Sequence, residues 1–228
     1  MIEGLRCLLW PKKIRRPRLC RPNYVGRHPG RVFLILGAGP SLLRYRQAIR
    51  QFVEAREPIL LSANAAGMEF GPQYVSFINR RRLCERAHLV GHRTALIGPH
   101  IPAWIVRRVG LTRWERMPWR DHLGPFGIHQ GVIQSDCGMS AGLLLAVAAV
   151  MGASEVWTAG VDGYAVGSPT SAFSLRRPAH DLDRALECQD RMRAVLPEIT
   201  QEYERRGIQG PWSLTPTRFA ALVRGPSA

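Results

Sequence analysis

The sequence of 228 residues has no long hydrophobic run, and its cysteines are few and scattered. No stretch approaches the ~18 consecutive apolar residues that a membrane-spanning helix needs, so an integral membrane protein is not expected. The cysteines form neither a Cys-x-x-Cys pair nor a cysteine and histidine cluster with zinc spacing. This pattern favours a reduced, cytoplasmic setting. The cysteines are Cys7, Cys20, Cys84, Cys137 and Cys188.

The N-terminal segment lacks the order of features found in a secretory signal. It begins MIEGLRCLLWPKK, where basic residues follow a very short apolar run instead of preceding a longer one, so no export signal is expected. Residues 1–30 are predicted to form a basic arm and residues 221–228 a tail. Two roles fit the arm: peripheral contact with the inner face of an anionic membrane, or an unstructured solubilising segment.

Acidic residues are few, since 17 Asp and Glu stand against 32 Lys and Arg, which gives a net charge of +15. Such an excess suits anionic partners or substrates, or simply a solvated surface. The sequence contains no RNP-like aromatic motif, zinc finger or helix-turn-helix pattern, so nucleic acid is not expected as a partner. The length corresponds to one domain, which is predicted to span residues 31–220. Nothing in the sequence indicates an oligomeric state.

Short apolar runs alternate with helical periodicity along most of the chain. Residues 32–36 form a continuous apolar run before a glycine, which is typical of a strand buried on both faces. Residues 111–130 are rich in Trp, Pro, Gly and His, which indicates a long, lid-like loop. The alternation predicts one α/β, Rossmann-like domain of a modified nucleotide-binding, GT-A-like kind, with a mainly parallel sheet flanked by helices. Further strands are expected at 58–62, 74–78, 94–97, 155–161 and 212–214, and helices at 41–56, 80–89, 102–109, 139–151 and 181–206.

The first predicted strand ends in a glycine-rich turn, Gly37-Ala38-Gly39-Pro40-Ser41. In open parallel sheets ligands bind beyond the carboxyl ends of the strands, and glycines allow the backbone and the following helix N-terminus to approach a phosphate. Ser41 either donates its hydroxyl or caps the helix. The turn lacks the third glycine of GxGxxG, where Leu42 stands, and the Lys-Ser/Thr pair of a P-loop. We therefore predict a phosphorylated nucleotide here, with a purely structural turn as the alternative.

An ordered set of motifs covers roughly residues 31–220: ILGAGPSL, LSANAAG, YVSFINRRR, DCGMSAGLLLAVAAVMGASEVWTAGVDGYAVGSPTSAF and AHDLDRALECQDRM. In its order and spacing this set resembles the bacterial family 42 sialyltransferases and related glycosyltransferase-like domains with GxGPSL and GxD motifs. The resemblance implies a CMP-activated nonulosonic acid as donor, a glycan or small hydroxyl acceptor, an inverting reaction and no divalent metal or other cofactor.

The resemblance also implies roles for individual residues. His180 corresponds to the general base, a role that suits a group with a pKa of about 6.5, whereas the alternative is a surface histidine before a helix. Tyr164 corresponds to one of two tyrosines near the phosphate. Asp162, at the end of a strand, is a candidate to bond the ribose, to orient its loop or to serve as a buried structural carboxylate. The candidate donor site comprises Gly37, Ala38, Gly39, Ser41, Asn64, Asn79, Cys137, Gly138, Asp162 and Tyr164.

Three positions depart from the resembled pattern. Ala38 stands where an asparagine is usual, Cys137 replaces a serine, and the second tyrosine is replaced around Thr170 or Ser171. Either the donor differs, or another group such as an arginine neutralises the phosphate, or the activity has diverged.

Two other functions remain open from the sequence. One is a pyrophosphokinase-like enzyme that uses ATP and a metal held by Asp162, Asp181 and Asp183, although N-capping by Asp181 explains the DxD motif more simply. The other is a catalytically inactive protein that binds nucleotide or glycan. The run Arg80–Arg82 is interpreted as a solvated helix face in preference to a contact with phosphate or an acidic sugar.

Overall fold

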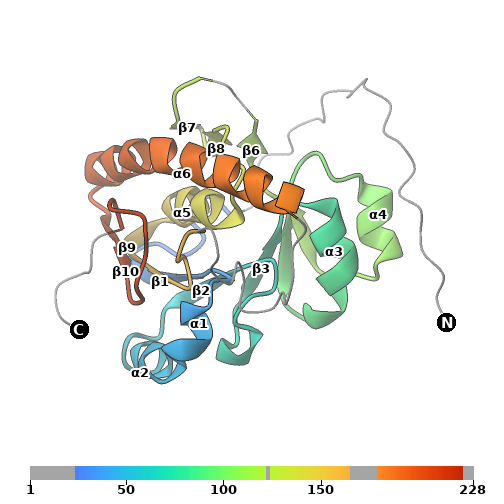
Figure 1. The fold of residues 1–228 in the computed structure, drawn as a ribbon, viewed down its shortest axis with the longest axis horizontal. Coiled ribbons are helices and arrows are strands. Elements are labelled where there is room, and N and C mark those ends of the chain that lie inside the picture. The colour runs from blue at the N-terminus through green and yellow to red at the C-terminus, as the bar shows by residue number, and fades with distance from the viewer. Residues whose placement is uncertain (1–23, 122–123, 165–178, 223–228) are drawn as a thin grey trace.

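A seven-stranded sheet forms the centre of the computed structural model, which describes residues 24–121, 124–164 and 179–222 (Figure 1). The strand order is β10-β9-β1-β2-β3-β4-β5, and all neighbouring strands run parallel. The α/β class predicted from the sequence is confirmed. The strands are β1 (Arg31–Leu36), β2 (Ile59–Ala63), β3 (Tyr74–Phe77), β4 (Thr94–Ile97), β5 (Trp114–Arg116), β9 (Ala153–Ala159) and β10 (Gln209–Ser213).

Helices cover both faces of this sheet because β1 carries apolar side chains on both sides. Phe33 and Ile35 belong to the core on one face, while Leu34 and Leu36 belong to the core on the other, and all four are fully buried. A continuous apolar run is what a strand covered on both faces requires. The helices are α1 (Ser41–Arg44), α2 (Arg46–Arg56), α3 (Arg80–Arg86), α4 (Ala103–Arg108), α5 (Ser140–Met151) and α6 (Ala179–Arg206), with short 3₁₀ turns at Met68–Phe70 and Ala87–Leu89.

One face is covered by α5, and α6 lies across α5 in turn (Figure 1). Every residue of α5 is buried, which explains why its sequence is apolar all round. Tyr203 of α6 donates a hydrogen bond from its hydroxyl to the carbonyl oxygen of Leu145 in α5, at 2.8 Å. Within the described ranges, α5 is too short and α6 too polar to cross a bilayer, and no other helix is long enough.

The opposite face is covered by α1 to α4. Leu42, Ile49 and Phe52 pack on β1 and β2, and Leu83 packs in a second cluster with residues of β3 and β4. The helix predicted over residues 41–56 is divided at Tyr45, whose backbone leaves helical geometry. Periodicity could not reveal this break because the apolar positions continue through it.

Residues 111–130 do not form the long loop that their composition suggested. They contain β5 and the short strands β6 (Trp119–Arg120) and β7 (Gly127–His129), and the latter two join β8 (Val132–Gln134) in a second sheet of order β6-β8-β7. Strands of two or three residues are too short to display a period of two. The described part of this segment also lines none of the pocket described below, so the structure gives no support to a lid there.

The basic arm ends earlier than residue 30, because residues 24–30 pack against the domain. Tyr24 is fully buried, and the backbone N–H groups of Gly26 and His28 donate to the carbonyls of Val150 and Met151. These bonds satisfy carbonyl groups at the end of α5 that have no partner inside the helix. The C-terminal boundary shifts too, since Leu222 is buried in the core. Most of the basic arm lies outside the described residues.

Candidate functional site

A pocket of about 430 Å³ lies at the carboxyl ends of β1, β2, β3 and β9, on the edge of the sheet where open α/β folds bind ligands. The chain runs outward from β1 to β5 on one side and adds β9 and β10 on the other, so the pocket includes the point where the strand order reverses. Its lining residues are Gly37, Ala38, Gly39, Ala63, Asn64, Ile78, Asn79, Arg81, Arg82, Arg86, Gly138, Met139, Ser140, Ala141, Gly160, Val161, Asp162, Gly163, Tyr164, Ala185 and Cys188.

The glycines of the turn after β1 are required by contact with the protein itself. A Cβ at Gly37 would lie 2.4 Å from the carbonyl oxygen of Gly160. A Cβ at Gly39 would lie 2.4 Å from the carboxyl carbon of Asp162 and 2.6 Å from the same carbonyl oxygen. Real side chains do not tolerate such distances, so the two glycines allow the loop after β9 to pack directly on the loop after β1. We call Gly37, Gly39, Gly160 and Asp162 the glycine wall of the pocket.

The hydrogen-bond donors of the glycine wall are used within the protein. The backbone N–H groups of Gly37 and Gly39 donate to the carbonyls of Ala159 and Gly160, at 2.8 and 2.7 Å. Ser41 donates its backbone N–H to Oδ2 of Asp162, at 2.8 Å, and its hydroxyl to Oδ1. The Asp162 carboxylate therefore occupies the N-terminus of α1, where an anionic ligand was expected.

Two of the predicted roles need correction for this reason. Ser41 is buried and does not line the pocket; it anchors Asp162. The phosphate predicted at the glycine turn would meet a carboxylate and would find the N–H groups of residues 37, 39 and 41 already bonded. Local sequence could not show this, because Asp162 lies 121 residues away from Ser41.

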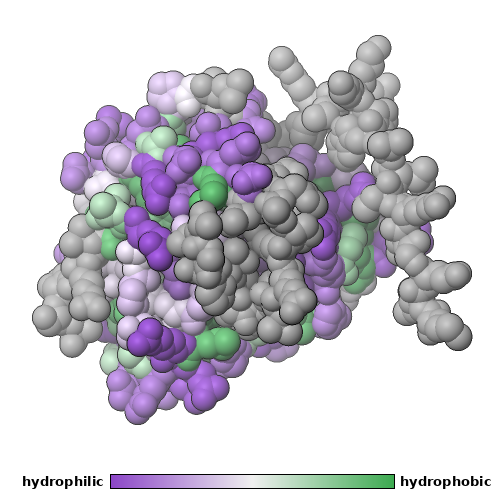
Figure 2. Space-filling model, viewed as in Figure 1, coloured by the Kyte–Doolittle hydropathy of each residue, from purple (hydrophilic) through white to green (hydrophobic). Residues whose placement is uncertain are grey.

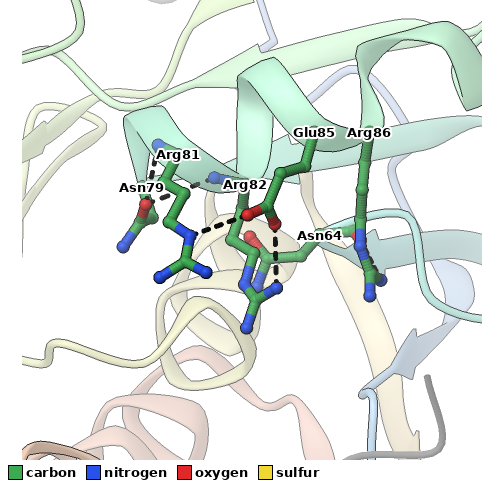
Figure 3. A network of polar contacts seen from close by, with 6 residues as sticks. All are labelled: Asn64, Asn79, Arg81, Arg82, Glu85 and Arg86. Atoms are coloured by element: carbon green, nitrogen blue, oxygen red, sulfur yellow. Dashed lines mark hydrogen bonds and ion pairs between the residues drawn. The ribbon is translucent and has the colours of Figure 1, made fainter. Parts of the chain in front are cut away.

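The opposite side of the pocket is formed by α3 and the ends of β2 and β3. The side chain of Asn79 caps α3, accepting hydrogen bonds from the backbone N–H groups of Arg81 and Arg82, at 2.9 and 3.3 Å. Glu85 accepts from Nε of Arg81 at 2.7 Å and from Nη1 of Arg82 at 2.9 Å (Figure 3). Burial disfavours the charged form of Glu85, but the two arginines outweigh it and lower its pKa.

Arg86 completes this side one helical turn after Arg82. Its Nη1 donates to the backbone carbonyl of Asn64 at 3.2 Å, and Figure 3 shows the guanidinium groups of Arg81, Arg82 and Arg86 on the same side of α3. Burial lowers the pKa of Arg86, and the nearby charge of Arg82 lowers it further. We call Arg81, Arg82 and Arg86, with Asn64 and Asn79, the arginine wall.

Asn64 holds an unusual position in the arginine wall. Its backbone is left-handed, with φ of 54°, a conformation that asparagine adopts more readily than most residues. Its Nδ2 donates to the hydroxyl of Ser140 at 3.3 Å, while its Oδ1 is buried and has no hydrogen-bond partner among the described residues. A buried acceptor without a donor is costly, which suggests that a ligand supplies one.

A third side is formed by the start of α5 and by α6. Gly138 lines the pocket, and the hydroxyl of Ser140 lies beside Asn64. Tyr164 also lines the pocket, and its backbone is held by the buried Gln189, whose amide accepts from the Tyr164 N–H and donates to its carbonyl. Cys188 of α6 lies next to Gly138, since a Cβ on this glycine would be 3.0 Å from its sulfur.

Cys137 does not contact the pocket, contrary to the prediction. Its side chain is buried behind the lining, close to the Met139 carbonyl and to Gly142. Burial raises the pKa of the Cys137 thiol to about 12. The neighbouring Gly138 lines the pocket, whereas the thiol of Cys137, one residue earlier, lies in the core.

The predicted base lies at the start of α6. His180 is in the first turn of this helix, but its side chain lies outside the described residues, as do the side chain of Asp181 and residues Thr170 and Ser171. The helix begins at Ala179, so Asp181 follows its start and is not the N-cap that the sequence suggested.

Sequence reasoning missed several residues of this site. Arg82 was assigned to a solvated face, although it lines the pocket and its side chain is only 25% exposed. Arg86, Ser140 and Gln189 were not considered. The signal available for Arg86 was its spacing, because it follows Arg82 by one turn on a helix that comes after a polar strand end.

No protein-family model and no curated protein matches the sequence. A solved structure, that of the MAf glycosyltransferase from Magnetospirillum magneticum AMB-1, matches 93% of this chain with a TM-score of 0.57 and 15% sequence identity. The chain spans 36% of that protein's length. The fold is therefore shared with a glycosyltransferase, as the sequence resemblance implied, while nothing in this likeness singles out family 42.

Proposed function

We propose that the protein is a glycosyltransferase that transfers a sugar from a nucleotide-activated donor to a hydroxyl acceptor. The supporting observation is the pocket at the point of strand reversal, bordered by the Asp162 carboxylate on one side and by three guanidinium groups on the other. A nucleotide sugar carries hydroxyl groups, which donate to a carboxylate, and phosphate, which accepts hydrogen bonds from guanidinium groups. The fold shared with a glycosyltransferase is consistent with this proposal.

The donor we favour is a CMP-linked acidic sugar such as sialic acid, as the sequence resemblance implies. Its phosphate and its carboxylate are both anions, and guanidinium groups bind such planar or branched oxyanions with paired hydrogen bonds. The same positive charges stabilise a departing phosphate without a divalent metal. This supports the metal-independent form of the reaction.

The reaction needs one base. In the proposed step, the acceptor hydroxyl attacks the anomeric carbon opposite the bond to the CMP phosphate, so the configuration inverts. The bond from this carbon to the phosphate oxygen breaks, CMP leaves with the bonding electrons, and His180 takes the acceptor proton. His180 belongs to the same helix as Ala185 and Cys188, which line the pocket.

Ligand binding tests the proposal first. Thermal unfolding should be recorded with CMP, CDP, UDP, ATP, NAD and S-adenosylmethionine, because a ligand that binds only the folded protein raises its melting temperature. We expect CMP to give the largest increase. A response to NAD alone would contradict a nucleotide-sugar enzyme.

Turnover tests the role of His180. With a CMP-linked acidic sugar as donor, His180→Ala should lower the rate of transfer by about 10²- to 10⁴-fold while CMP affinity is retained. His92→Ala is the matched control, because His92 is an exposed histidine outside the pocket lining. Full transfer activity in His180→Ala would contradict the assignment of His180 as the general base.

The same measurements separate the two alternatives. Stabilisation by ATP only in the presence of magnesium would favour a pyrophosphokinase-like enzyme, although Asp162 is already bonded to Ser41 and Asp183 is exposed. Binding of CMP without transfer or hydrolysis of any donor would favour an inactive binding protein.

A further inference from the structure

The guanidinium groups of the arginine wall and the carboxylate of the glycine wall lie on opposite sides of the pocket. Arg81 and Arg82 share Glu85, and Arg86 bonds to the backbone carbonyl of Asn64. Three guanidinium groups line the pocket, and Asp162 on the far side is the only carboxylate among the described lining residues. An anionic ligand is therefore attracted toward α3 and away from the glycine wall.

The position of these charges suits recognition of an oxyanion. Arg82 and Arg86 are four residues apart, so their side chains leave α3 on the same face, about one turn apart. Burial lowers the pKa of Arg86, and repulsion from the charge of Arg82 on the same face lowers it further. A phosphate between them would relieve this repulsion and accept hydrogen bonds from both.

Asn64 adds a second requirement for the ligand. Its buried Oδ1 accepts no hydrogen bond from the described residues, although its backbone carbonyl lies next to Arg86. A ligand that satisfies this wall therefore presents a hydrogen-bond donor beside its anion. A phosphate ester of a sugar does so, because the sugar hydroxyls lie a few bonds from the phosphate.

We infer that the phosphate of the donor binds to Arg82 and Arg86 of α3, with a sugar hydroxyl donating to Asn64, and that the glycine turn contacts an uncharged part of the nucleotide. The identity of the ligand rests on the proposed function. The placement of the phosphate rests on the two walls alone.

Calorimetric titration tests the placement with three probes: CMP, cytidine and inorganic pyrophosphate. Arg86→Gln and Arg82→Gln should each weaken CMP and pyrophosphate binding by about 10- to 100-fold and leave cytidine binding within about twofold. Arg80→Gln is the matched control, since Arg80 belongs to α3 but does not line the pocket. Arg86→Lys keeps the charge without the paired donors and should fall between wild type and Arg86→Gln.

Each outcome supports or overturns the placement. Unchanged CMP affinity in both glutamine variants would overturn it, as would an equal loss for CMP and cytidine. Failure of the wild type to bind either CMP or pyrophosphate would overturn it as well. If Arg86→Gln does not fold, the CMP affinity of Arg82→Gln alone tests the placement. Phosphate-dependent binding with no sugar transfer would retain the anion site and refute only the proposed function.

Discussion

The two walls of the pocket begin alike, each where a strand of the sheet leads through a short turn into a helix, yet they offer opposite surfaces to a ligand. In the glycine wall, the N–H groups of Gly37 and Gly39 are bonded inside the protein, the N–H of Ser41 behind it bonds to Asp162, and the Asp162 carboxylate lines the pocket. In the arginine wall, Asn79 satisfies the start of α3 with its own side chain, which leaves the longer arginine side chains to line the pocket.

This difference shows that a glycine turn before a helix is not by itself an anion site. Glycines permit close approach, and the group that approaches can be a ligand or another loop of the same chain. Here Gly160 and Asp162 take that place. In Figure 2, hydrophilic side chains cover most of the described surface on the face shown, so the hydropathy of the surface does not single out a binding site. The distribution of charge around the pocket does.

The largest expected effect concerns the packing of the glycine wall. Gly39→Ala places a Cβ 2.4 Å from the carboxyl carbon of Asp162, so the loop must move, and we expect a loss of about 1–3 kcal/mol in the free energy of unfolding. Gly138→Ala is the matched control across the pocket, because its Cβ would meet only the flexible Cys188 side chain, at 3.0 Å. Urea unfolding of both variants measures the difference. Equal losses would show that the glycine wall is no more tightly packed than its neighbour.

A smaller effect is expected from the charge of the glycine wall. Asp162→Asn removes the negative charge but keeps the shape, so the bonds from Ser41 weaken and unfolding should become easier by about 1–2 kcal/mol. Pyrophosphate affinity should stay constant or rise, because a charge that repels phosphate is lost. Asp183→Asn, an exposed carboxylate, is the control and should change stability by less than about 0.5 kcal/mol. A marked fall in pyrophosphate affinity would contradict this and would favour an anion site at the glycine turn.

The smallest effect separates Cys137 from the pocket. Because burial raises its pKa to about 12, its thiol stays protonated at pH 8 and should remain unmodified by iodoacetamide while the exposed Cys84 reacts. Reactivity should rise only as the pH approaches that value or as the protein unfolds. Peptide mass spectrometry measures both sites, and urea provides the control in which both react. Labelling of Cys137 as fast as Cys84 in the folded protein would contradict the burial of this thiol in the core.

Much of the fold was predictable because its signals are local. The apolar run of β1 and the apolar sequence of α5 each reflect burial on all sides, and both elements were predicted within about two residues. The strands of residues 111–130 were missed because three residues are too few to show a period. Residues 24–30 were missed because their order depends on the end of α5.

The candidate site was predictable to the extent that strand ends predict it. Asn64, Asn79, Asp162 and Tyr164 all line the pocket, since the carboxyl ends of parallel strands converge on one edge. The errors at Ser41 and Cys137 have a different origin. Whether a side chain at such an edge faces the pocket or the core depends on its neighbours from distant parts of the chain.

The sequence by itself determined most strands of the seven-stranded sheet, the helix that is buried on all sides and several residues of the carboxyl edge, because periodicity and apolar runs are properties of neighbouring residues. Only the tertiary structure decided how that edge is used. The contact of Asp162 with Ser41 joins residues 121 positions apart, and the hydrogen bond from Arg86 to Asn64 joins α3 to the turn after β2. Such contacts decide which donors and charges remain for a ligand, and no local pattern encodes them.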